Sequence, residues 1–108
     1  MFLLSSSAQW RMFPASDQTR CRLQAVFPVE LRPYAEALLV EECSANLPFL
    51  EAATPEQLER IRFVALKLSE GTIDGLCDAI QLAQVDWRDL LVAASFAEDV
   101  RAHENWMP

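Results

Sequence analysis

Apolar residues recur at helical spacing in four successive stretches of the chain, all of them after residue 28. Within each stretch an apolar residue returns every three or four positions, which places those side chains on one face of a helix. The four stripes consist of Leu31, Ala35, Leu38 and Leu39; Leu58, Ile61, Ala65 and Leu68; Ile73, Leu76, Cys77 and Ile80; and Trp87, Leu90, Leu91 and Ala94. Helices this short gain most of their stability by docking their apolar stripes together. The pattern therefore predicts an all-α fold, a compact bundle of four to five short helices.

Helix start and stop signals divide the second half of the chain into consecutive helices with almost no linker between them. The sequence Thr54-Pro55-Glu56-Gln57 is a capping box with proline at the first helical position. Gly71 suits a C-terminal stop, and Thr72 and Asp86 suit the N-terminal caps of the next two helices. A final helical turn or two is expected from Asp99 onwards. The predicted helices are residues 31 to about 45, 55–70, 72–84 and 86–96, followed by that short turn.

The first 27 residues lack a comparable pattern. Trp10, Met12, Phe13 and Phe27 are scattered among polar residues there, and Pro14 interrupts them. Residues 20–26 alternate loosely, which fits a short strand or a single helical turn equally well. At 108 residues the chain is long enough to form one domain with its own core. We therefore expect an irregular N-terminal arm over residues 1–27 and one helical domain over residues 28–108.

Charge is unevenly distributed along this acidic chain, whose formal net charge is −7. Residues 1–34 hold four arginines and two acidic residues, whereas the remainder holds five basic and 14 acidic residues. An acidic surface repels phosphate backbones, which proteins bind through lysine and arginine. Nucleic acid is therefore not the expected partner. Nucleic-acid binding through the N-terminal arginines is kept as an alternative, and these are Arg11, Arg20, Arg22 and Arg32.

Composition and cysteine spacing indicate a folded protein of a reducing compartment. The chain is 52% hydrophobic and has only two glycines, which argues against disorder. Cys21, Cys43 and Cys77 form no C-x-x-C pair and no even-numbered disulfide framework. No stretch approaches the roughly 20 apolar residues of a membrane-spanning helix, and no secretory signal is recognised. We expect a cytoplasmic protein without a membrane partner; the arginines and serines of the first 23 residues leave a mitochondrial presequence as an open alternative.

The only histidine, His103, is the main candidate for acid–base or metal chemistry. Asp99 stands four residues earlier on the same helical face, which suits two metal ligands or a carboxylate that orients an imidazole. Glu104 is the third residue of this alternative function, a metal- or acid–base-dependent enzyme. The chain has no H-E-x-x-H motif, no glycine-rich phosphate loop and no G-x-S-x-G elbow. We therefore expect no cofactor, no metal and no catalytic residue, with Asp99 as a helix cap and His103 packed beside Trp106.

Surplus apolar surface on the second predicted helix is the feature that most suggests a function. Phe63 and Leu66 lie away from the main stripe of that helix, so the helix must be covered on two sides. Either the N-terminal arm or another chain covers the second side, because soluble proteins seldom leave a large apolar patch bare. The sequence therefore predicts a small non-enzymatic interaction or regulatory protein. Its partner would be another protein, or a second copy in a homodimer, bound through Phe63, Leu66 and an acidic surface.

Overall fold

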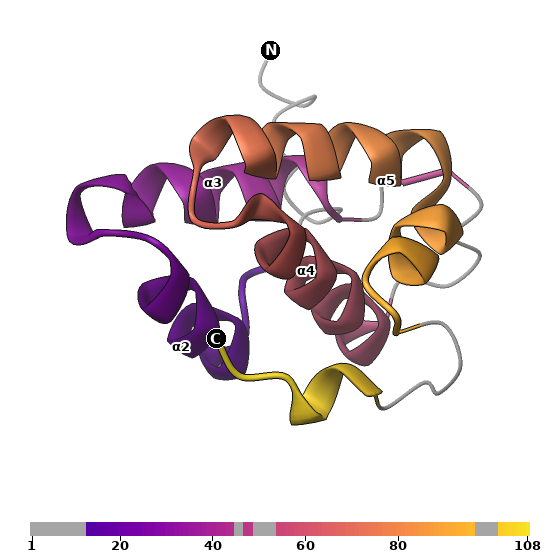
Figure 1. Cartoon of the computed structure of the whole chain (residues 1–108), viewed down its shortest axis with the longest axis horizontal. Coiled ribbons are helices and arrows are strands. Elements are labelled where there is room, and N and C mark those ends of the chain that lie inside the picture. Colours follow the sequence, from indigo (N-terminus) through magenta and orange to yellow (C-terminus); the bar gives the residue numbers. More distant parts are fainter. Residues whose placement is uncertain (1–12, 45–46, 49–53, 97–101) are drawn as a thin grey trace, which may run out of the picture.

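The computed structural model describes residues 13–44, 47–48, 54–96 and 102–108 of the chain. The described residues form only helices and their connections, without a strand, which confirms the predicted all-α bundle (Figure 1). The elements in chain order are α2 (Asp17–Val26), the 3-10 turn η1 (Val29–Leu31), α3 (Arg32–Glu42), α4 (Pro55–Ser69), α5 (Ile73–Ala93) and the 3-10 turn η2 (Ala102–Asn105). None of the described helices is both long and apolar enough to cross a membrane.

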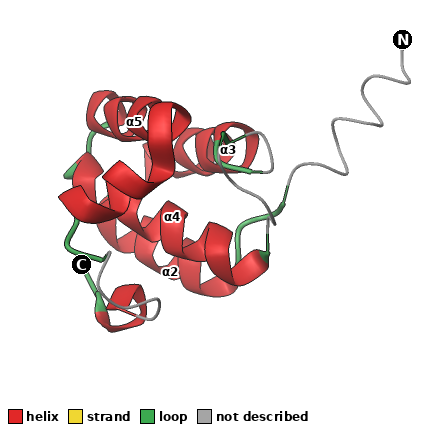
Figure 2. Cartoon of the chain, turned by 90° about the vertical axis from the view of Figure 1, so that its right-hand side faces the viewer, coloured by secondary structure: helices red, strands yellow, loops and turns green. Residues whose placement is uncertain are grey.

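Helix α4 lies at the centre of the bundle. It packs most extensively on α5 and also contacts α2 and η2, while α3 contacts both α2 and α5. Figure 2 shows α4 between α3 and α5 on one side and α2 on the other. Six consecutive residues of α4, from 61 to 66, are buried, although one of them is an arginine. The sequence around Phe63 is therefore nearly all apolar because α4 is a central helix that other elements cover on two sides.

The predicted caps form in the structure because each capping hydroxyl accepts a backbone N–H that the first helical turn leaves unpaired. The Thr54 hydroxyl accepts from the Gln57 amide at 3.1 Å, and the Thr72 hydroxyl accepts from the Gly75 amide at 2.9 Å. The predicted stop at Gly71 is also confirmed, since this residue adopts a left-handed conformation with φ of 81°. Helices α4 and α5 are thus separated by a turn of only three residues.

Helix α5 bends at Asp86, where the sequence predicts the start of a new helix. Asp86 has extended backbone angles, φ −164° and ψ 107°, and its carboxylate accepts the Arg88 amide at 3.0 Å. The two halves of α5 correspond to the predicted helices 72–84 and 86–96, which are therefore confirmed. The bend turns the second half of α5 back towards α4 (Figure 1), where Lys67 and Arg60 donate to the carbonyls of Ala94 and Phe96 at 2.9 and 2.7 Å.

The expected irregular arm is wrong for residues 17–26, which form α2. The Ser16 hydroxyl caps this helix by accepting the Thr19 amide at 3.1 Å, and Leu23 joins the core. The apolar period failed to reveal α2 because two of its buried positions hold polar residues, Thr19 and Arg22. Helix α2 shares one core with the helices after residue 28, whereas residues 1–12 lie outside the described part of the chain.

Candidate functional site

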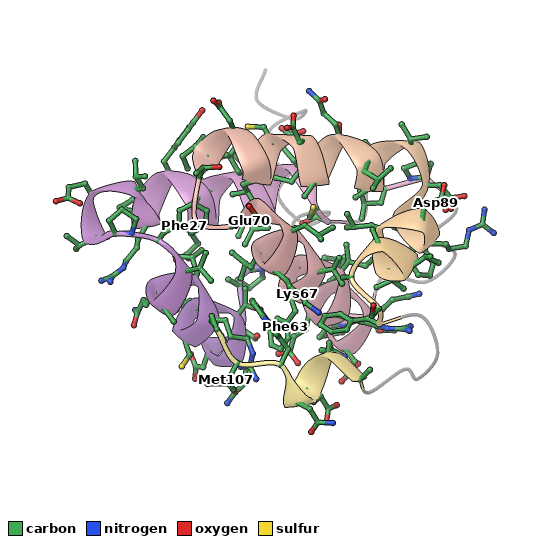
Figure 3. The ribbon with its side chains drawn as sticks, viewed as in Figure 1. Phe27, Phe63, Lys67, Glu70, Asp89 and Met107 are labelled. Atoms are coloured by element: carbon green, nitrogen blue, oxygen red, sulfur yellow. The ribbon has the colours of Figure 1, made fainter. Side chains whose placement is uncertain are left out.

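Phe63 and Leu66, the predicted partner-binding residues, lie in the core. Only 1% of Phe63 and none of Leu66 is exposed, so the prediction that they form a free binding surface is wrong. The chain itself covers this side of α4, through α2 and through residues 102–108, which we call the C-terminal strap. Figure 3 shows the labelled Phe63 between α4 and this strap. Sequence periodicity identifies an apolar side of a helix, but it does not show whether the same chain or another protein covers that side.

Three side chains surround the Phe63 ring. The Arg22 guanidinium carbon of α2 lies 4.2 Å from the ring centroid, a distance typical of a cation–π contact. The His103 ring meets it edge-on at a centroid distance of 5.2 Å, and the Trp106 ring lies at 6.3 Å. These contacts bring together α2, α4 and the strap, three segments that are distant in the sequence.

Arg22 also binds the strap directly. Its Nε donates to the Trp106 carbonyl at 2.9 Å, and its Nη2 donates to the Glu104 carbonyl at 3.4 Å. The remaining amine group, Nη1, donates to the backbone and side-chain oxygens of Gln18 at 3.2 and 2.9 Å. Because Arg22 is only 4% exposed, these bonds satisfy a buried charge that would otherwise be costly. Nothing in the local sequence marks this arginine, whose partners are mostly main-chain atoms.

His103 lies under the strap, with 3% of its surface exposed. Its Nε2 is 3.8 Å from the Oε2 atom of Glu59, while the other carboxylate oxygen of Glu59 accepts the Ser16 hydroxyl at 2.6 Å. The Nδ1 atom of His103 is buried and has no hydrogen-bond partner among the described residues. Burial is the main cause that lowers the pKa of His103 below its usual value of 6.5.

Of the three residues of the alternative enzyme, the structure describes His103 and Glu104. Ser16 and His103 approach opposite oxygens of Glu59, so the hydroxyl does not donate to the imidazole as a nucleophile would to its base. Glu104 is exposed on the strap, and Asp99 lies outside the described residues. The described residues contain no group of three or more histidine, cysteine or carboxylate side chains that could hold a metal.

A small cavity of about 260 Å³ adjoins the cluster, at the junction of α2, α4 and the strap. Gln18, Arg22, Glu59, Phe63 and Glu104 line it. The cavity brings solvent-sized space next to the Phe63 ring and to the carboxylate that faces His103. The strap is therefore held by a few specific contacts around a hollow rather than by continuous close packing.

A second buried arginine, Arg62 of α4, joins four acceptors that are far apart in the sequence. It donates to the carbonyls of Phe13 at 2.6 Å, Pro14 at 3.0 Å and Cys43 at 3.0 Å, and to the Ser44 hydroxyl at 2.9 Å. Burial lowers the pKa of Arg62 and raises the pKa of the neighbouring Cys43 thiol to about 12. Cys43 is thus a protonated core residue, and Arg62 fixes the segment before α2 against the end of α3.

The basic residues of the described chain are all engaged within the molecule. Each donates to a backbone carbonyl or to an acidic side chain, and they are Arg20, Arg22, Arg32, Arg60, Arg62, Lys67 and Arg88. By contrast, several exposed carboxylates form no hydrogen bond or ion pair with any described residue, among them Asp17, Glu30, Glu41, Glu56, Glu70, Asp74 and Asp78. Among the described residues, the charged side chains without an internal bond are therefore acidic.

Comparison of the chain with protein-family models, with curated proteins and with solved structures found no match.

Proposed function

We propose that the protein is a small non-enzymatic interaction protein that binds a basic partner protein through the outer face of α5. This acidic face consists of Asp74, Asp78, Gln81 and Val85, which recur at helical spacing and are all exposed. Val85 leaves 69% of its surface uncovered, so the face offers an apolar contact beside its two carboxylates. Figure 1 shows the first half of α5 along one edge of the described part of the molecule.

The observation that carries this proposal is which charged side chains are bonded within the molecule and which are not. Every described basic residue is bonded within the molecule, whereas Asp74 and Asp78 have no partner among the residues that the structure describes. A basic partner would supply the missing cations, and complementary charge both speeds association and selects the partner. A second copy fits less well because it would bring the same acidic face, and like charges oppose an interface. The phosphates of nucleic acid carry the same unfavourable sign.

The test uses the full chain as bait at low and at moderate salt, followed by calorimetry with each captured partner after purification. For the partner bound by α5, Asp74→Asn with Asp78→Asn should weaken binding about tenfold, or about 0.7 kcal/mol per charge. The matched control is Glu30→Gln with Glu56→Gln. It removes the same net charge from exposed positions on η1 and on the first turn of α4.

The control pair should leave the affinity within about twofold of the unaltered chain, since exposed charges far from an interface are screened by salt. Equal losses in both pairs would show that net charge alone governs binding, and no loss in the Asp74 and Asp78 variant would remove α5 from the proposal. Light scattering after size exclusion checks the second copy. We expect a monomer. A dimer that dissociates when Val85 is changed to Asp would show that the partner of this face is a second copy of the chain and not a basic protein.

A further inference from the structure

We propose that the C-terminal strap is a pH-operated cover: protonation of His103 releases residues 102–106 from α4 and uncovers the Phe63 ring. The strap holds the only histidine of the chain at its most buried point. Its other fixed contacts are the Trp106 ring and the two carbonyls bound by Arg22. The inference is independent of the acidic face on α5, because that face lies on a different helix.

The surroundings of His103 suit a neutral imidazole better than a charged one. A neutral ring can carry its proton on Nε2, facing Glu59, and leave Nδ1 as a bare acceptor in the apolar contact. A protonated ring carries a second N–H on Nδ1, which is buried and has no acceptor among the described residues. At 3.8 Å the Glu59 carboxylate is too far from Nε2 for a short charge-assisted hydrogen bond.

Charged groups around the imidazole come from every element packed against it and act in opposite directions. Helix α4 contributes Glu59 and Arg60, α2 contributes Arg22, and the strap itself contributes Glu104. The two carboxylates favour the protonated ring and the two guanidinium groups disfavour it. Burial then decides the balance, and it lowers the pKa of His103 in the docked strap.

The sign of the pH effect follows from this direction. A released strap exposes His103, whose pKa returns towards its usual value of 6.5. Docking is therefore strongest above pH 6.5 and weakens as the pH falls below that value, until the docked histidine is protonated too. Each pKa unit of difference between the two states weakens docking about tenfold at low pH.

Release of the strap would expose the side of α4 that is otherwise closed. The Phe63 ring loses two of its three aromatic and cationic neighbours when His103 and Trp106 leave, and only Arg22 remains over it. The cavity of about 260 Å³ beside the ring then loses the wall that Glu104 of the strap provides. An apolar surface around Phe63 would thus become available only at acidic pH.

Proton NMR gives a direct test, because the single histidine produces one titrating imidazole signal. The expected pKa of His103 lies below 6.5. Amide hydrogen exchange of the peptide covering residues 102–108, corrected for the intrinsic rate, should rise between pH 7.5 and pH 5.5, by about fivefold if docking lowers the pKa by one unit. His103→Phe keeps an aromatic ring against Phe63 without a proton to bind, so its strap exchange should not depend on pH.

Glu59→Gln provides a second measurement that does not require His103 to be replaced. The amide removes the nearest negative charge and keeps an acceptor for Ser16, so the pKa of His103 in the docked strap should fall further and the strap should be released more strongly at low pH. Glu56→Gln, one turn earlier on the same helix and exposed, should leave the titration unchanged. A His103 pKa at or above 6.5, or equal pH dependence in His103→Phe, would overturn the proposal.

Discussion

The two sides of α4 are packed by different kinds of contact. One side carries Ile61, Val64, Ala65 and Leu68, which share a helical face and pack in the apolar core with residues of α3 and α5. The other side carries Glu59, Arg62, Phe63 and Leu66 and lies towards α2, the segment before it and the strap. We refer to them as the aliphatic side and the mixed side. Both are buried, yet only the aliphatic side is free of charged groups.

The difference shows how each side depends on its neighbours. Aliphatic contacts are non-directional, so the aliphatic side needs only apolar residues of suitable size opposite it. The mixed side depends on directional hydrogen bonds, which Arg22, Arg62 and Ser16 donate to oxygen atoms at fixed positions. Loss of one such donor leaves several buried acceptors unpaired at once. We therefore expect the mixed side to be the more sensitive of the two to substitution.

The largest expected effect is that of Arg62→Met. Methionine fills a similar volume but abandons the buried carbonyl of Cys43 and the partly buried carbonyls of Phe13 and Pro14. The free energy of unfolding should fall by about 3 kcal/mol, after the relief of arginine desolvation is set against the unpaired carbonyls. Urea denaturation followed by circular dichroism measures this change.

Ile61→Val is the control on the aliphatic side, one position earlier on the same helix and fully buried. It removes a single methylene and should cost about 1 kcal/mol. Arg62→Lys separates charge from geometry, because one ammonium group cannot reach the four acceptors that the guanidinium joins. If Arg62→Met proved no more harmful than Ile61→Val, the directed bonds would not be what holds the mixed side.

The same contrast explains how much of the fold and site the sequence could predict. Helix α4 and both halves of α5 were predicted because their buried positions are apolar and because Thr54, Thr72 and Asp86 announce their starts. Helix α2 was missed since a count of apolar residues treats a buried Arg22 as exposed. Whether the chain itself covers Phe63 depends on contacts with residues more than 35 positions away, which local periodicity cannot report.

Gly75→Ala tests the turn that sets the aliphatic side against α5. Alanine normally stabilises a helix by about 1 kcal/mol relative to glycine. At this position, however, the added Cβ would collide with the Ser69 carbonyl and would lie 2.8 Å from the Thr72 hydroxyl. The backbone must shift, so we expect a net loss of about 1–2 kcal/mol despite the better helix propensity.

Thermal denaturation of Gly75→Ala beside Ala79→Gly makes the comparison within one helix. Ala79→Gly should lower the stability in the ordinary way, because glycine weakens a helix and this change also removes a buried methyl group at a position that is 5% exposed. Both variants should therefore melt at a lower temperature than the unaltered chain. A higher melting temperature for Gly75→Ala would mean that the turn accommodates the methyl group and that the close approach of α4 and α5 is not required.

The smallest expected effect is that of Asp86→Asn, at the bend of α5 and away from both sides of α4. Asparagine can still accept the Arg88 amide and cap the second half of the helix, but it loses the ion pair in which Arg88 Nη2 lies 2.7 Å from Asp86 Oδ2.

Hydrogen bonds from Arg88 are the main cause that lowers the pKa of Asp86 below 3.8. The contribution of the charged form is therefore complete above pH 3.8 and is lost as the pH falls through the lowered pKa. The stability difference between the two chains, measured by urea denaturation, should be small at pH 7 and should shrink further below pH 3.8, because an exposed ion pair contributes little. A large loss at neutral pH would show that directed polar bonds matter outside the mixed side as well, and the contrast between the two sides of α4 would then describe the whole molecule.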